Sequence, residues 1–115
     1  MKGWVAIPRT LFEHQKMRDA DVRAIVLEIY QRACIQQSKV SFRGKGFVLQ
    51  RGQLITSAAR LARSTGASQM KVRRTIEWLT GDGHIEQQTD NRSRIITINY
   101  DYLRSFTIIY DYLRL

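Results

Sequence analysis

The stretch that decides the fold is TSAARLARSTGASQMKVRRTIEWLTGDG, residues 56–83. Ser57 is a good N-cap residue, and Gly66 suits the left-handed position that ends a helix, so a first short helix is predicted between them. Ser68 is positioned to cap a second helix over residues 69–80. Two short helices joined by a tight turn indicate a helix-turn-helix, a motif that places its second helix on duplex DNA.

The second helix of this stretch is amphipathic. Its inward positions are Val72, Thr75, Ile76 and Leu79, which recur at helical spacing. The N-terminal residues of such a helix reach base edges, where Arg suits guanine and Gln suits adenine. We therefore predict DNA contacts from its cap, its start and its outward face: Ser68, Gln69, Met70, Lys71, Arg73 and Arg74. The alternative is a helix whose basic face is only solvated.

Neighbouring segments extend the predicted contact surface. On the first helix, Ser57 at its start and Arg60 are predicted to face phosphates, since helix N-termini and arginines favour anions. Residues 85–89 and 96–100 alternate in polarity and are predicted to form a β-hairpin with a polar tip. Arg92 and Arg94, at or near that tip, either contact the minor groove and its phosphates or only keep the tip soluble.

Further helices and a second hairpin are predicted before this stretch. A short helix over Pro8–His14 and a long one over Met17–Gln37, capped by Asp19 or Asp21, follow from apolar periodicity. Residues 38–50 break that period and are predicted to form a hairpin or an extended arm.

The turn within residues 38–50 is basic. It carries Arg43 and Lys45, which alternate with Gly44 and Gly46, and it is interpreted as either a phosphate-contacting arm or a plain surface loop. Residues 54–56 then form a short strand that leads into the first helix of the deciding stretch.

Composition indicates a basic single domain. The 115 residues carry a formal net charge of +9 with a sequence pI of about 10.3, the electrostatic footprint of a nucleic-acid binder, although simple solubility also explains it. No apolar run approaches the roughly 20 residues that span a bilayer, so no membrane association is expected. Cys34 is the only cysteine, so an internal disulfide is excluded and a cytoplasmic location is expected.

Catalytic and metal-binding chemistry finds little support in the sequence. His14 and His84 have no cysteines at metal-ligand spacing, and no glycine-rich phosphate loop is present. We therefore expect no enzyme activity, no metal and no cofactor. Cys34 is predicted to be a buried small hydrophobe, and Trp78 to be partly buried against the N-terminal helices.

Three segments, in this order, carry a resemblance to a known family. They are GWVAIPRTLFEH (3–14), RGQLITSAARLARSTGASQMKVRRTIEWLTGDGHIE (51–86) and RIITINYDY (94–102). Together they resemble the N-terminal winged-helix domain of DnaD-type primosomal proteins and of phage replication initiators (replisome organisers). The resemblance implies a role in replication initiation and self-association through N-terminal segments. It also implies a C-terminal domain that we expect this chain to lack.

The sequence thus predicts a winged helix-turn-helix over residues 1–100, mainly α with a small antiparallel β-sheet (α+β). Residues 101–115 form an extension in which YDYLR, residues 100–104, recurs at 110–114. The repeat is either a local duplication or an extra element that pairs with a partner chain.

The predicted function is double-stranded DNA binding in replication initiation of a phage, plasmid or mobile-element type. The expected partners are duplex DNA, further copies of the chain as a homodimer or higher oligomer, and replication proteins. The alternatives are a transcriptional regulator on the same fold and an oligomerisation module without DNA binding.

Overall fold

The computed structural model describes residues 7–33, 36–89 and 93–99. Within these residues the chain is α+β, with four α-helices, one 3-10 helix and five strands in two antiparallel sheets. The elements follow one another as α1 (Arg9–Phe12), η1 (Gln15–Arg18), α2 (Ala20–Arg32), β1 (Ser38–Phe42), β2 (Lys45–Leu49), β3 (Gln53–Thr56), α3 (Ala58–Thr65), α4 (Gln69–Gly81), β4 (Ile85–Thr89) and β5 (Arg94–Ile98).

The start of the predicted long helix is wrong. Met17 lies in η1, and α2 begins only at Ala20 because Asp19 takes the non-helical backbone conformation of an N-cap. Its Oδ1 accepts hydrogen bonds from the backbone N–H groups of Asp21 (2.8 Å) and Val22 (3.5 Å). Of the two predicted caps, Asp19 or Asp21, the structure has Asp19, and the chain before it forms a separate 3-10 turn.

Two further helix ends in the N-terminal part of the chain also differ from prediction. The short N-terminal helix is limited to Arg9–Phe12 instead of reaching His14, which caps η1. The long helix ends at Arg32 instead of Gln37, since Ala33 takes a non-helical backbone conformation with φ −60° and ψ 138°. The predicted burial of Cys34 lies outside the described residues.

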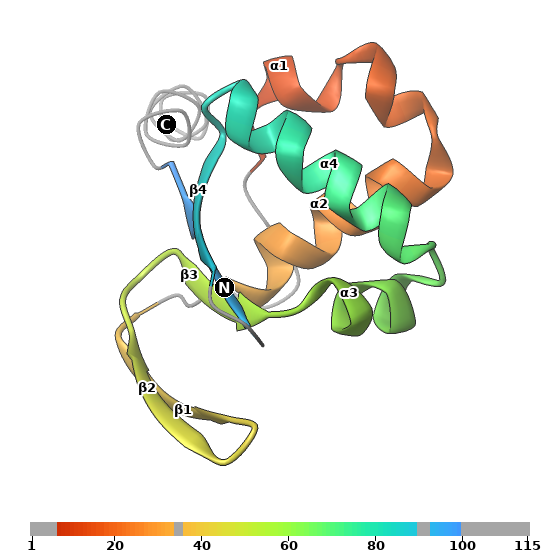
Figure 1. Ribbon diagram of the computed structural model, residues 1–115. Coiled ribbons are helices and arrows are strands. Elements are labelled where there is room, and N and C mark those ends of the chain that lie inside the picture. The colour runs from red at the N-terminus through yellow and green to blue at the C-terminus, as the bar shows by residue number, and fades with distance from the viewer. Residues whose placement is uncertain (1–6, 34–35, 90–92, 100–115) are drawn as a thin grey trace, which may run out of the picture.

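Two separate sheets form. Of the two predicted forms, a hairpin or an extended arm, β1 and β2 make a hairpin, which projects from the body of the protein next to α3 in Figure 1. β3, β5 and β4 form a three-stranded sheet in that order, with β5 in the centre. Leu54 pairs with Ile96 and Ile85 with Ile98, and all four side chains are buried.

The core lies where α2, α3 and α4 cover the three-stranded sheet (Figure 1). Its fully buried large side chains come from these helices, from β4 and β5, and from α1: Leu11, Ile25, Val26, Ile29, Leu61, Val72, Ile76, Leu79, Ile85 and Ile96. In the described part of the chain, no helix combines the length and the apolar character needed to cross a membrane.

The turn between α3 and α4 forms as the sequence predicts. Gly66 adopts φ 80°, ψ 0°, the left-handed conformation that ends α3. Ser57 Oγ accepts the N–H of Arg60 (3.1 Å), and Ser68 Oγ accepts the N–H of Lys71 (3.2 Å), so both predicted caps are confirmed. The predicted inward positions of α4 are buried as well: Val72, Thr75, Ile76 and Leu79.

Candidate nucleic-acid interface

The charge of the chain is strongly segregated. No Asp or Glu occurs between Glu28 and Glu77 in the sequence, a stretch that contains β1, β2, α3 and the first two turns of α4. Its cationic residues are Arg32, Lys39, Arg43, Lys45, Arg51, Arg60, Arg63, Lys71, Arg73 and Arg74. Anionic partners are therefore expected to favour these elements.

The outward face of α4 is exposed as predicted. Met70 is 60% exposed, and Arg73, Arg74 and Glu77 are exposed beside it. Among the described residues, neither Arg73 nor Arg74 forms an ion pair with a carboxylate. This face thus offers two guanidinium groups and an apolar side chain to a partner.

One side of α4 leads to the β4–β5 hairpin through polar contacts. Gln69 Oε1 accepts a hydrogen bond from Arg73 Nη2 (3.3 Å). Thr80 is seven residues, about two helical turns, after Arg73 and so lies on the same side of the helix. Its Oγ1 accepts from Gln87 Nε2 of β4 (3.4 Å), and Gln87 Oε1 accepts from Arg94 Nη1 of β5 (3.2 Å). A line of polar side chains therefore joins the start of α4 to the hairpin.

Gln87 was not predicted as a site residue. Sequence alternation places it in phase with the buried Ile85, where an apolar residue is the normal choice. The sequence signal that could have identified Gln87 is a polar side chain at an inward position of a strand. Its half-buried amide connects α4 to Arg94 near the hairpin tip.

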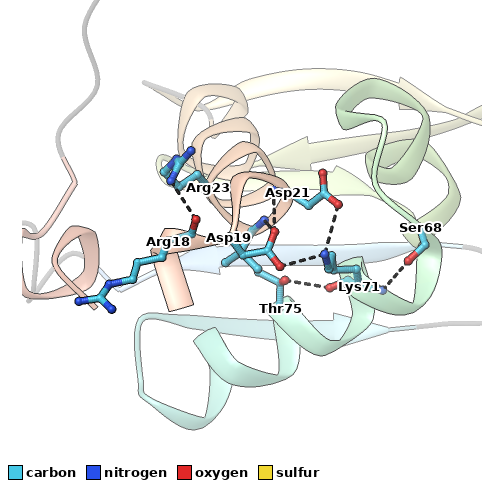
Figure 2. A network of polar contacts seen from close by, with 8 residues as sticks. Arg18, Asp19, Asp21, Arg23, Ser68, Lys71 and Thr75 are labelled. Carbon is cyan, nitrogen blue, oxygen red and sulfur yellow. Dashed lines mark hydrogen bonds and ion pairs between the residues drawn. The ribbon is translucent and has the colours of Figure 1, made fainter. Parts of the chain in front are cut away.

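The opposite side of α4 is fixed to the N-terminal elements. Lys71 Nζ lies 2.9 Å from Asp19 Oδ2 and 3.2 Å from Asp21 Oδ2 (Figure 2). The hydrogen bond from Lys71 lowers the pKa of Asp19, and the hydrogen bonds to Asp19 and Asp21 raise the pKa of Lys71. Two carboxylates thus surround the ammonium group, and the predicted DNA contact of Lys71 stays a prediction.

Trp78, two turns after Lys71, extends this fixed side. Its ring centroid is 4.9 Å from that of His14, and the Nζ of Lys16 lies 5.9 Å from the centroid. Its Nε1 donates a hydrogen bond to Asp82 Oδ2 (2.8 Å). The predicted partial burial of Trp78 against the N-terminal helices is therefore confirmed.

The remaining predicted residues that the structure describes lie at or on three elements, α3, α4 and β5. Ser57 and Ser68 use their hydroxyl oxygens as helix caps, whereas Arg60 is exposed on α3. Arg94 stands opposite Thr89 in the last pair before the hairpin loop, as its predicted place near the tip requires. Arg92 lies outside the described residues.

No family model matches the chain, and no curated protein matches it. The resemblance to DnaD-type primosomal proteins stays a prediction. Among the described residues, no three His, Cys, Asp or Glu side chains gather in a way that suits a metal ion.

Proposed function

We propose that this domain is a winged helix-turn-helix that binds duplex DNA, with α4 in the major groove and the β4–β5 hairpin as its wing. The order helix, strand, helix, helix, strand, strand in α2, β3, α3, α4, β4 and β5 supports the fold assignment, and the β1–β2 hairpin is an insertion in it. A helix about 10–12 Å wide fits a major groove about 12 Å wide.

The observation that carries the proposal is the polar line from α4 to the wing. Because Thr80 and Arg94 both contact Gln87, the side of α4 that bears Arg73 continues into the hairpin. A helix and a hairpin joined in this way present Arg73, Arg74 and Arg94 from two adjoining elements. Duplex DNA carries one negative charge per roughly 1.7 Å of its axis and matches these positive charges.

The side chains divide into two roles under this proposal. Gln69 and Met70, in the first turn of α4, are placed to meet base edges, where an amide pairs with adenine and an apolar group packs on the thymine methyl. Arg73 is placed to read guanine or to bind phosphate, while Arg74 and Arg94 bind phosphates. Gln69 and Arg73 exchange their mutual hydrogen bond for bonds to DNA.

We further propose that DNA binding serves replication initiation, which rests on the sequence resemblance alone. Regulation of transcription on the same fold is the alternative within DNA binding. A footprint at a palindromic promoter site, instead of at a replication origin, would favour the regulator.

Fluorescence anisotropy with a labelled duplex of about 20 base pairs tests the DNA proposal. At 3.4 Å per base pair this duplex is roughly 68 Å long, which exceeds the longest protein dimension of 45 Å. Arg73→Gln with Arg74→Gln should weaken binding and reduce the salt slope by about 0.9 for each lost phosphate contact. The matched control is Arg9→Gln with Arg18→Gln, which removes the same charge from exposed positions on α1 and η1.

Two results contradict the proposal. The first is a wild-type protein that does not bind duplex at 50 mM salt. The second is an unchanged affinity and salt slope in the variant with Arg73→Gln and Arg74→Gln, which contradicts the assignment of α4 as the DNA-contacting helix. Stable oligomers in light scattering, combined with the absence of DNA binding, would favour the oligomerisation module.

A further inference from the structure

One aromatic ring lies between the β1–β2 hairpin and α3. Phe42, the last residue of β1, is only 5% exposed, although Ser41 and Arg43 on either side are exposed. Arg43 Cζ lies 5.4 Å from the ring centroid of Phe42, and Arg60 Cζ of α3 lies 5.1 Å from it. Two guanidinium groups from different elements therefore lie within 5.4 Å of the centre of the same ring.

The turn that brings Arg43 to this ring has an unfavourable backbone for an arginine. Arg43 and Gly44 connect β1 to β2 with φ values of 53° and 79°. Arg43 is the one non-glycine residue with positive φ in the described part of the chain. Two-residue hairpin loops of this kind favour Asn-Gly or Gly-Gly. A strained position occupied by a charged side chain points to a functional role for that side chain.

The charges near the Phe42 ring also indicate a functional role for Arg43. The β1–β2 hairpin carries Lys39 and Lys45 besides Arg43, and residues 38–50 contain no Asp or Glu. Neither Arg43 nor Arg60 pairs with a carboxylate among the described residues. Two like charges close to one ring repel each other, and a bound anion converts that repulsion into attraction. Guanidinium groups match the oxygens of a phosphodiester in geometry and charge.

We propose that Arg43 and Arg60 together hold one phosphate of the DNA backbone, which makes the β1–β2 hairpin a second DNA-contacting arm. This inference rests on the proposed function, because it places the arm on the same duplex that α4 and the wing bind. Figure 1 shows the hairpin projecting from the body of the protein next to α3. Under this proposal the hairpin lengthens the contact surface beyond the helix-turn-helix. Lys39 and Lys45 add positive charge along the arm.

The test uses two single variants and their double variant on the duplex described above. Arg43→Asn removes the guanidinium but suits the positive φ, so the turn is kept. Arg60→Gln removes the second guanidinium from an exposed helical position. Each single variant should lower the salt slope by about 0.9 and weaken binding roughly five-fold at 0.15 M salt. The double variant should lose little more than either single variant, because both side chains serve one phosphate.

Arg9→Asn on α1 is the control for net charge, and thermal melts of all variants check folding. An unchanged salt slope in both Arg43→Asn and Arg60→Gln overturns the inference. If the variant with Arg73→Gln and Arg74→Gln loses binding in the same experiment, the proposed function still holds. Additive losses of affinity in the double variant contradict the proposal that Arg43 and Arg60 bind the same phosphate. An equal loss in Arg9→Asn shows that net charge is sufficient and overturns the local contact. A wild-type protein without DNA binding overturns both proposals.

Discussion

Lys71 Nζ at the start of α4 lies 2.9 Å from Asp19 Oδ2 at the start of α2, so an ion pair connects the two helices. Arg23 reinforces this region from inside α2, since its Nη1 donates to the carbonyl oxygens of Met17 (3.0 Å) and Arg18 (3.2 Å). The first turn of α4 is therefore fixed against α2 and η1 (Figure 2). The same contacts place two carboxylates next to the proposed DNA-reading turn.

Asp21→Asn should raise the affinity for duplex DNA at low salt. The substitution removes one of the two carboxylates that contact Lys71, so more of the positive charge of Lys71 becomes available to phosphates. Salt-dependent anisotropy measures the effect, and Glu13→Gln, which removes an exposed carboxylate after α1, serves as the control. Equal affinities of Asp21→Asn and Glu13→Gln would contradict a local role of Asp21.

Acid stability should depend on Asp19. Its pKa is lowered in the folded protein by the Lys71 hydrogen bond, so its contribution to stability is present above its ordinary pKa of 3.8 and is lost as the pH falls through the lowered value. Asp19→Asn keeps an N-cap but removes the titration. Melting temperatures between pH 6 and pH 2 should therefore fall less steeply for Asp19→Asn than for the wild type, and parallel curves would contradict the prediction.

His84 should add a second pH dependence at higher pH. It is 7% exposed, and burial lowers its pKa, while nearby Asp82 raises the pKa and His14 lowers it. Because the neutral form is favoured in the folded state, its contribution to stability is complete above about pH 6.5 and is lost as the pH falls below that value. His84→Gln should flatten the loss of melting temperature between pH 7.5 and pH 5, and an unchanged slope would assign that loss to other groups.

Much of the fold around α3 and α4 was predictable because local signals agree there. Ser57, Gly66 and Ser68 mark helix ends by their own chemistry, and the apolar spacing of α4 gives its buried face. The N-terminal boundaries were less predictable because an internal capping residue, Asp19, divides one periodic stretch into η1 and α2.

The candidate interface was only partly predictable for a different reason. The exposure of Arg73 and Arg74 follows from helical periodicity. The contacts of Lys71 with Asp19, and of Arg60 with Phe42, join residues far apart in the sequence. Periodicity carries no information on such pairs, so the charge balance of Lys71 and the role of Phe42 became visible only in three dimensions.

Gly66 should be sensitive to substitution for conformational reasons alone. A Cβ built at this position has no heavy atom within 4 Å, yet φ is +80°, where a side chain strains the backbone. Gly66→Ala should reduce the free energy of unfolding by about 1–2 kcal/mol. Gly66→Asn should cost less, because Asn tolerates the left-handed region. Urea unfolding of both variants checks the order, and an alanine variant as stable as the wild type would contradict it.

Arg94 should distinguish a wing that binds DNA from a hairpin that only closes the sheet. Its Nη1 donates to Gln87 Oε1 (3.2 Å), so a purely structural role predicts that Arg94→Gln and Gln87→Leu lower the melting temperature and leave the salt slope unchanged. A phosphate contact predicts that Arg94→Gln weakens duplex binding roughly five-fold at 0.15 M salt and lowers the slope by about 0.9. We expect the second result. Gln87→Leu, which keeps the arginine but removes the amide that positions it, should give a smaller loss of affinity with little change in slope.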